Sequence, residues 1–320
     1  MSDYILHNHN EDEIDRRGFL KCMAWAGTGM LWAAAGGSIA SRILRPASAI
    51  AAEQPGAGAG FTFVQISDSH VGFNKEANKD VLATLKEAVA KINALPNAPD
   101  FILHTGDLSH LSEAEEFDTL EQILKDCRTK QIFYVPGEHD VLSDNGKQYL
   151  ARFGKGTRGN GWFSFDHKGT HFVGLNNVLN IREGGLGVLG DEQIAWMTDD
   201  LRAISASTPV VVFAHIPLWE VYPQWGWGTD DGARALALLK RFGSVTVLNG
   251  HIHQVMKKTE GNATFHTAMS TAFPQPVPGS APKPGPMKVD AGILRHVLGI
   301  TDVTYTEGNH SLAVVDATLA

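Results

Sequence analysis

Cysteine and positive charge are both in short supply in this sequence. The 320 residues include 2 cysteines, and only Cys127 lies beyond the first 49 residues, so that part of the chain has no internal disulfide. Lys and Arg number 27 against 35 Asp and Glu, which gives a net charge of −8. This charge repels phosphate backbones, and we therefore expect no binding to nucleic-acid polymers.

Apolar residues and histidine, by contrast, are plentiful. Hydrophobic residues make up 43% of the sequence, enough to bury a sizeable core, which excludes disordered and fibrous classes. The 14 histidines are candidate metal ligands. Bound cations would allow an acidic protein to act on phosphate esters, because a divalent ion is usually the largest local charge.

The N-terminal segment carries a targeting pattern. Asp15–Lys21 reads Asp-Arg-Arg-Gly-Phe-Leu-Lys and precedes a mildly apolar stretch that ends at Ala40, which resembles a twin-arginine export signal. Small residues around Ala49 offer cleavage sites. We therefore expect a twin-arginine signal peptide over residues 1–49, a linker over 50–60 and one domain over 61–320. The protein would be exported by the twin-arginine machinery and be periplasmic or secreted.

An uncleaved membrane anchor is the alternative, because the 19 residues from Cys22 to Ala40 could span a bilayer. Their Gly and Ala content gives a poor insertion free energy, so we expect no stable membrane anchor. A lipid anchor on Cys22 is disfavoured by Lys21, which directly precedes it.

Five short apolar runs alternate with helical patterns after residue 60. The runs are typical of strands buried on both faces and span Phe61–Ile66, Phe101–His104, Ile132–Val135, Val210–Ala214 and Val245–Leu248. Helical spacing of apolar residues begins at Val81, Phe117 and Ile194, and Ser112–Glu115 has the form of a capping box. A hairpin is predicted around Lys168-Gly169, so the sheets are expected to be mixed.

The alternation predicts an α/β layered domain with functional residues just past the carboxyl ends of strands. Six prolines between Pro274 and Pro286 exclude regular structure there and indicate a surface excursion or lid.

Polar residues able to bind metal follow each of the five predicted strands. They are Asp68-Ser69-His70, Gly106-Asp107, Gly137-Glu138-His139-Asp140, His215 and Gly250-His251-Ile252-His253. Oxygen and nitrogen ligands of this kind favour Fe, Mn or Zn over Ca or Mg. On an extended segment, the paired residues of the first and last motifs would point the same way. The glycines allow tight turns at the strand ends.

In this order, the motifs Asp-X-His, Gly-Asp, Gly-X-His-Asp, His and Gly-His-X-His strongly resemble those of the calcineurin-like metallophosphoesterases. The resemblance covers roughly residues 61–254, and the stretches 210–219 and 247–254 look most like bacterial class III cyclic-nucleotide phosphodiesterases. It implies a four-layer α/β/β/α sandwich of mixed sheets flanked by helices. It also implies hydrolysis of phosphodiesters, with phosphomonoesters as the other substrate class.

Carried over by position, the resemblance implies two transition-metal ions, divalent or mixed-valence Fe, Mn or Zn. The first would be bound by Asp68, His70, Asp107 and His253, and the second by Asp107, Glu138, His215 and His251. In the family, a metal-bound hydroxide attacks phosphorus in line. His139 is the implied catalytic residue beside the substrate, where it stabilises charge or protonates the leaving oxygen, and Asp140 would orient its ring.

Glu138 departs from the family pattern, which usually has Asn at this position. The longer, anionic carboxylate could bind the second metal more tightly, weaken its pull on phosphate or repel an anionic substrate. The alternative is a displaced loop with a single-metal or altered site, and with it a non-catalytic metal-binding protein that retains the fold.

Two groups near the motifs leave alternatives open. His104 is expected to be a hydrogen-bonded core histidine, whereas His110 is either a partner of a metal ligand or a solvated turn residue. The aromatic loop after His215 either forms an apolar wall for a nucleobase or a lipid-like leaving group, or packs over the sheet edge. Its tryptophans are Trp219, Trp225 and Trp227.

Overall fold

The computed structural model describes residues 32–35, 38–41, 60–306 and 312–320. The chain divides into two units, residues 1–58 and 59–320. In the first unit, β1 (Trp32–Ala35) and β2 (Ser38–Ser41) pair antiparallel. The predicted arginine pair and cleavage sites lie outside the described residues. Among the residues described, none of the helices combines the length and apolar character needed to cross a bilayer.

The first sheet of the second unit has six strands. They are β6 (Phe163–His167), β7 (Thr170–Gly174), β8 (Val210–Ala214), β9 (Val245–Asn249), β10 (Lys257–Glu260) and β11 (Ala263–Thr267). Their order in the sheet is β10-β11-β9-β8-β7-β6. The outer pairs β10–β11 and β6–β7 are antiparallel, and the inner pairs are parallel.

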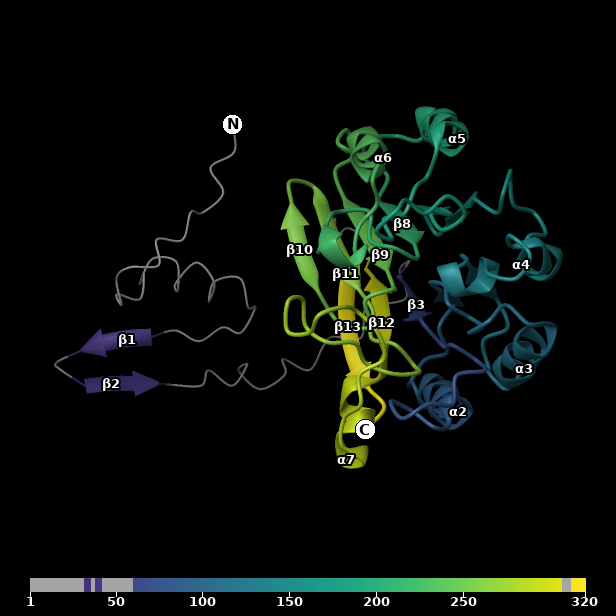
Figure 1. The fold of residues 1–320 in the computed structure, drawn as a ribbon. Helices are drawn as coiled ribbons and strands as arrows, with labels where there is room; N and C mark the ends of the chain where they lie inside the picture. Colours follow the sequence, from purple (N-terminus) through teal and green to yellow (C-terminus); the bar gives the residue numbers. More distant parts are fainter. Residues whose placement is uncertain (1–31, 36–37, 42–59, 307–311) are drawn as a thin grey trace. The chain divides into compact units, whose positions relative to one another are not determined.

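The second sheet has five strands. They are β3 (Phe61–Ile66), β4 (Phe101–His104), β5 (Ile132–Tyr134), β12 (Gly299–Tyr305) and β13 (Ala313–Thr318). Figure 1 labels β3, β12 and β13. Their order is β13-β12-β3-β4-β5, with β3, β4 and β5 parallel to one another and β12 antiparallel to both of its neighbours. Both sheets are therefore mixed, as predicted.

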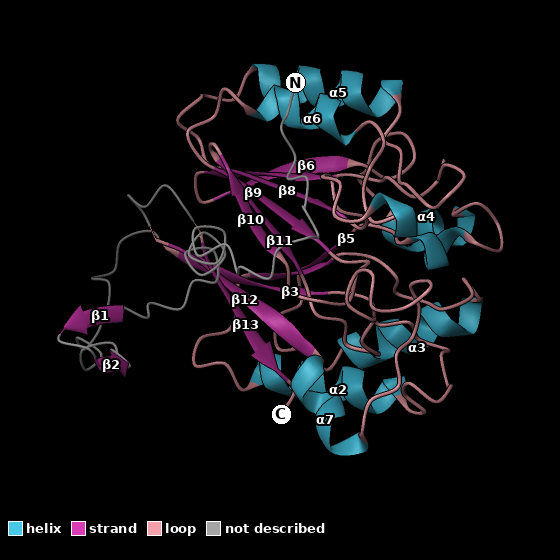
Figure 2. Ribbon diagram, turned by 60° about the vertical axis from the view of Figure 1, so that its left-hand side comes forward, coloured by secondary structure: helices cyan, strands magenta, loops and turns pink. Residues whose placement is uncertain are grey.

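Helices cover the outer faces of both sheets, and the two sheets lie between the helical layers (Figure 2). The six-stranded sheet carries α5 (Asp191–Arg202) and α6 (Gly232–Leu239), and the five-stranded sheet carries α2 (Val81–Asn93) and α3 (Ala114–Leu124). The other helical segments among residues 60–306 are α4 (Lys147–Phe153), α7 (Ala291–Val297), and the short 3₁₀ turns η1 (Glu138–Val141) and η2 (Pro223–Trp225). This arrangement confirms the four-layer α/β/β/α fold.

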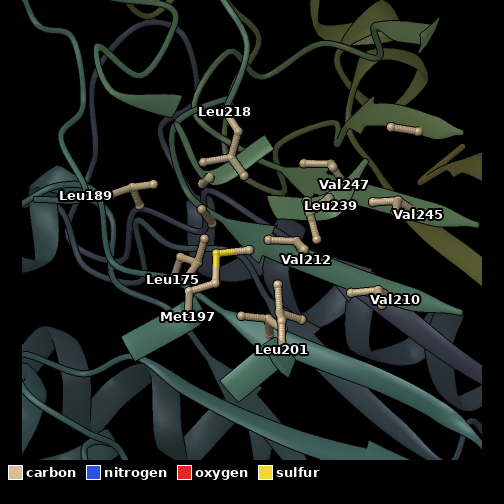
Figure 3. Packing of buried hydrophobic residues seen from close by; sticks show 14 of the residues in the cluster. Leu175, Leu189, Met197, Leu201, Val210, Val212, Leu218, Leu239, Val245 and Val247 are labelled. Carbon is tan, nitrogen blue, oxygen red and sulfur yellow. The ribbon is translucent and has the colours of Figure 1, made fainter. Parts of the chain in front are cut away.

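Three hydrophobic clusters join the layers. Between the sheets, Phe63 and Phe101 of one sheet pack against Phe172 of the other. On the outer side, Met197 of α5 packs with Val212 of β8 (Figure 3), and α2 and α3 pack on β3 and β4 in the same way. A fully buried side chain of this size contributes about 1.5–3 kcal/mol, so these clusters hold the ends of the strands in fixed positions.

The sequence-based predictions of local structure are largely confirmed. The five apolar runs are strands with bounds that differ by at most one residue, and the hairpin turns at Lys168 and Gly169, which both have positive φ. The predicted capping box is wrong by one position. Glu116, rather than Glu115, accepts the backbone N–H of Glu113, because the hydroxyl of Ser112 is hydrogen-bonded to Ser143.

Candidate metal centre

The loops that follow the five predicted strands meet at one end of the two sheets and are hydrogen-bonded to one another. The N–H of Asp68 donates to the carbonyl of Gly106, and the N–H of His70 donates to that of Asp107, each at 2.9 Å. The N–H of Gly250 donates to the carbonyl of His215 at 3.0 Å. These bonds tie the loop after β3 to the loop after β4, and the loop after β9 to the end of β8.

The backbone at these loops is not extended, so the expectation of strand-like alternation is wrong. Five candidate ligands have left-handed φ values of 54°, 40°, 52°, 71° and 53°, for Asp68, His70, Asp107, His251 and His253 respectively. Sharp turns, rather than a pleated strand, direct the paired side chains into the centre. The cross-loop hydrogen bonds hold the loops in these uncommon conformations.

The three predicted glycines, Gly106, Gly137 and Gly250, are required by geometry, as the first two illustrate. Gly106 has a φ of 98°, and a Cβ there would lie 2.4 Å from Nδ1 of His215. Gly137 has an ordinary φ of −96°, but a Cβ there would lie 2.0 Å from Oδ1 of Asp107. The first glycine therefore serves a turn, and the second permits close approach of the loop to the Asp107 carboxylate.

The first cluster of ligand atoms is formed by Asp68, His70 and His253, all buried. Nε2 of His253 lies 3.2 Å from Oδ1 of Asp68 and 3.3 Å from Nε2 of His70. Burial opposes the charged form of Asp68, but His253 and His215 outweigh it and lower the pKa of this carboxyl to about 2. The cluster is thus an anionic carboxylate with two imidazoles.

The second cluster is formed by Glu138, His215 and His251. Oε2 of Glu138 lies 3.0 Å from Nε2 of His215, and Oε1 lies 2.9 Å from Nδ1 of His251. The loop that carries Glu138 is therefore in place, and the carboxylate reaches both histidines. The displaced-loop alternative does not describe this structure.

Asp107 lies between the two clusters. Its Oδ2 is 3.4 Å from Nε2 of His70 and 3.3 Å from Nε2 of His215. Its other oxygen, Oδ1, accepts the backbone N–H of His139 at 2.9 Å, which fixes the orientation of the carboxylate. One carboxylate oxygen therefore faces a histidine from each cluster.

The donor set fits transition-metal ions. Oε2 of Glu138, Nε2 of His215 and Nδ1 of His251 are buried and have no hydrogen-bond partner, although they lie close together. Buried polar atoms without partners cost about 1–3 kcal/mol each, and a cation among them would remove that cost. Imidazole nitrogens and carboxylate oxygens are the ligands that Fe, Mn and Zn accept.

Backbone carbonyls hold the rings of His215 and His253 in the tautomer that leaves Nε2 unprotonated. Nδ1 of His215 donates to the carbonyl of Thr105 at 2.7 Å, and Nδ1 of His253 donates to that of Phe273 at 2.5 Å. In each ring, the proton on Nδ1 leaves the lone pair of Nε2 directed at the cluster. These contacts orient the rings for metal coordination.

His139 is held next to the clusters, but not by Asp140. Its Nδ1 donates to the carbonyl of His110 at 2.7 Å, which leaves Nε2 free. Burial lowers its pKa, but the charges of Asp107 and Glu138 and the hydrogen bond to His110 outweigh burial and raise the pKa of His139. The prediction that Asp140 orients the ring is therefore wrong, because a backbone carbonyl occupies that position.

Asp140 instead organises the loops. Its buried carboxylate accepts the backbone N–H groups of Gly137, Leu108 and Ser109 at 2.9, 3.1 and 2.8 Å, and the hydroxyl of Ser109 at 2.8 Å. Burial and the charge of Asp107 raise the pKa of Asp140 to about 7, while these N–H groups oppose the shift. The residue joins the loop of Asp107 to the loop of Glu138.

The structure places His104 and His110, whose roles the sequence did not decide between. His104 is buried, and its Nε2 is hydrogen-bonded to the hydroxyl of Ser69 at 2.9 Å, as expected for a core histidine. His110 has its Nδ1 3.4 Å from Nδ1 of His70, and its ring stacks on that of His139. The structure thus supports the alternative that His110 is a partner of a metal ligand.

The tryptophans after His215 pack into the protein. Trp227 is 1% exposed and Trp225 is also buried, and both pack against Ile252, the residue between two candidate ligands. Trp219 packs against Phe265 of β11. The packing alternative therefore holds, and a stacking wall formed by Trp227 is ruled out by its burial.

Sequence reasoning missed the role of the proline-rich segment. It contains no helix or strand, as predicted, but it is fixed to the ligand loop. Nε2 of Gln275 donates to the carbonyl of His251 at 2.8 Å. The ring of Phe273, directly before the segment, stacks on that of His70 and contacts that of His253. Only the proximity of this segment to the Gly-His-X-His motif in sequence could have indicated the contact.

Several known proteins that resemble this chain are phosphoesterases, which agrees with the clusters of candidate metal ligands described above. A family model described as calcineurin-like phosphoesterase matches residues 61–255. A glycerophosphodiester phosphodiesterase from Enterobacter lignolyticus is 26% identical over 223 residues, covering 66% of this chain and 77% of that protein. A 3′,5′-cyclic-nucleotide phosphodiesterase from Nostoc sp. is 23% identical over 218 residues, covering 66% of this chain and 79% of that protein.

A solved structure of a dimetal phosphatase from Danio rerio shares the fold, with a TM-score of 0.60. It is 16% identical, and the match covers 81% of this chain and 96% of that one. The family model spans more than half of the chain, from β3 through the segment that carries His251 and His253. The chain therefore belongs to the calcineurin-like phosphoesterases, a family of metal-dependent hydrolases.

Proposed function

We propose that the protein is a dinuclear metal-dependent phosphoesterase that hydrolyses small phosphodiesters. The position of Asp107 carries the proposal, because one of its oxygens lies 3.4 Å from a histidine of one cluster and 3.3 Å from a histidine of the other. A carboxylate so placed can bridge two cations. Two of the relatives are named as phosphodiesterases, which supports diesters as the substrate class.

The proposed ligands divide by cluster. Asp68, His70 and His253 hold one ion and Glu138, His215 and His251 the other, with Asp107 shared. When bound, the ions supply Lewis-acid chemistry: they neutralise phosphoryl oxygens and acidify a water molecule to ionise near neutral pH. The chain fixes the spacing of the clusters through the cross-loop hydrogen bonds.

His139 is the proposed catalytic residue. Because its Nδ1 is engaged by the carbonyl of His110, its Nε2 is the atom that meets a phosphoryl or leaving-group oxygen. The raised pKa of His139 favours the protonated ring, which can stabilise negative charge or donate a proton. Replacement of this residue tests the role.

His139→Asn is expected to lower kcat roughly 100-fold or more at unchanged metal content. His296→Asn is the matched control, because His296 lies exposed on α7. Turnover of bis-p-nitrophenyl phosphate and elemental analysis of the same samples decide the outcome. Unaltered turnover in His139→Asn would remove the residue from the mechanism.

Hydrolysis by the wild-type protein tests the function itself. Protein loaded with Mn or Fe is expected to bind two ions per chain and to hydrolyse bis-p-nitrophenyl phosphate, and the metal-free protein to be inactive. Two bound ions without hydrolysis of any phosphoester would instead establish a non-catalytic metal-binding protein that retains the fold.

We also propose export through the twin-arginine route, on the pattern Arg16-Arg17-Gly18-Phe19-Leu20-Lys21. The double variant Arg16→Lys with Arg17→Lys is expected to stay in the cytoplasm with its N-terminal segment uncleaved. Cell fractionation and the mass of the protein measure both properties. Normal export of the double variant would contradict the proposal.

A further inference from the structure

Glu138 differs from the other carboxylates of the centre in its exposure. Its side chain is 23% exposed, whereas those of Asp68 and Asp107 are 0% and 2% exposed. Both of its oxygens face histidines of the second cluster. An anion that enters the centre from solvent therefore meets the charge of Glu138 before it meets the other two carboxylates.

The charge of the centre depends strongly on this residue. Three carboxylates contribute −3 and the four neutral histidines contribute nothing, so two divalent ions leave a net charge of about +1. A neutral residue at position 138 would leave about +2. Within the described part of the chain, the ion pairs of these seven side chains join carboxylates to histidines, and none involves Lys or Arg.

We propose that Glu138 is a specificity-determining residue that selects monoanionic phosphodiesters over dianionic phosphomonoesters. The inference rests on the proposed phosphoesterase function and identifies the residue that sets its substrate class. Electrostatic energy is proportional to the product of the charges, so the carboxylate penalises a dianion about twice as much as a monoanion at the same position. Selectivity is thus obtained by a repulsive group directed against the competing substrate.

The two consequences of the Glu138 carboxylate, metal retention and repulsion, are separable by substitution. Glu138→Gln keeps the length of the side chain and removes the charge, and Glu138→Asn removes the charge and shortens the side chain. Glu260→Gln is the matched control for the loss of one negative charge. Glu260 is 69% exposed on β10 and lies near the start of β9, whereas the ligand loop follows the end of β9.

The experiment compares p-nitrophenyl phosphate with bis-p-nitrophenyl phosphate at about pH 8, where the monoester is a dianion. Each protein is assayed with two ions per chain, verified by elemental analysis. Both Glu138 variants are expected to lower the ratio of diester to monoester kcat/KM at least tenfold, which corresponds to about 1.4 kcal/mol. Glu260→Gln is expected to leave the ratio unchanged.

Binding gives a readout independent of turnover. Calorimetry of the metal-loaded proteins is expected to show inorganic phosphate binding at least about tenfold more tightly to the Glu138 variants, with dimethyl phosphate changed about threefold or less. Unchanged phosphate affinity together with an unchanged kcat/KM ratio would overturn the proposal. Variants that cannot bind a second ion at any metal concentration would overturn it too, because Glu138 would then serve retention.

Failure of the proposed function gives a different result. If the wild-type protein binds two ions and hydrolyses neither ester, the proposed phosphoesterase function is wrong. The affinities of the wild-type protein and the Glu138 variants for phosphate and dimethyl phosphate still test whether Glu138 selects monoanions. If the protein hydrolyses both esters and the ratio of diester to monoester kcat/KM does not depend on residue 138, the proposed function stands and the role of Glu138 in selectivity is contradicted.

Discussion

The two ligand clusters differ in how completely the protein encloses them. Asp68, His70 and His253 are buried, and the ring of Phe273 contacts both of these histidines at centroid distances of 4.7 Å. In the second cluster, Glu138 is partly exposed and His251 is 12% exposed. The first cluster is therefore built into the core, whereas the second is open to solvent on one side.

Because of this difference in enclosure, we expect the two clusters to have different tasks. An enclosed set of ligands excludes water and keeps its geometry, which favours slow exchange of an ion. A more exposed set, whose buried polar atoms lack hydrogen-bond partners, is stabilised by an ion and exchanges it more readily with solvent. The shared Asp107 couples the two, and each of the following predictions tests that coupling or that asymmetry.

The largest expected effect is that of Asp107→Asn. The variant replaces an anionic oxygen that faces both clusters by a neutral group, so bound metal is expected to fall toward one ion or none and hydrolysis to be abolished. Elemental analysis and diesterase assays measure this. The exposed Asp118 supplies the control Asp118→Asn. Full activity with two ions in Asp107→Asn would disprove the dinuclear arrangement.

The next largest is the loss of stability in Asp140→Ala. Three backbone N–H groups and the Ser109 hydroxyl lose their buried acceptor, which is expected to cost on the order of 3 kcal/mol in the free energy of unfolding. Urea denaturation of the metal-free proteins measures the cost. Asp118→Ala, which removes an exposed carboxylate, is expected to cost less than about 1 kcal/mol. Equal midpoints for the two variants would contradict the role assigned to Asp140.

Metal removal tests the asymmetry directly. A chelator is expected to extract the ion of the open cluster at roughly tenfold lower concentration than the ion of the enclosed one. His251→Ala is expected to eliminate the early step and His253→Ala the late one, as followed by elemental analysis after equilibrium dialysis. Simultaneous release of both ions from the wild-type protein would show that exposure does not govern retention.

The smallest expected effect is that of Gln275→Ala. The amide of Gln275 donates to the carbonyl of His251 and accepts the N–H of Gly285 at 3.0 Å. Its loss removes one of the hydrogen bonds between the ligand loop and the proline-rich segment, while those of Gln254 to the carbonyls of Gln275 and Pro276 remain. We expect the affinity for the second ion to fall about tenfold and that for the first to stay unchanged. Gln122→Ala on the outer helix α3 is the control. Equal weakening of both ions would indicate a general loss of stability.

Much of the fold and of the centre could be predicted from the sequence. Each of the five apolar runs is a strand, and four of them are mostly or fully buried, whereas β5, at the edge of its sheet, is only half-buried. The residues after the runs include all seven candidate ligands. The structure brings all seven predicted ligand side chains together. The strand pattern predicts where these residues lie in the chain, and their assignment as ligands follows from the resemblance to the metallophosphoesterases.

Apart from the extended backbone expected at the paired ligands, the errors concern partners that lie far away in the chain. Ser112 does not cap α3, because its hydroxyl is bonded to Ser143, and Asp140 turns to the loop of Leu108 and away from the His139 ring. Burial of Trp227 likewise follows from packing against Ile252. None of these contacts has a local signature, so a residue pattern cannot predict them.

The left-handed backbone of the ligand loops has a consequence for protein engineering. Glycine adopts this conformation without strain, whereas each other residue there costs on the order of 1 kcal/mol. Five positions are affected, and they are Asp68, His70, Asp107, His251 and His253. Glycine at any of these positions would remove the backbone strain and, with it, a candidate metal-ligand side chain. A library selected for thermal tolerance alone would accumulate such variants, so a screen that improves this scaffold must reward bound metal as well as survival on heating.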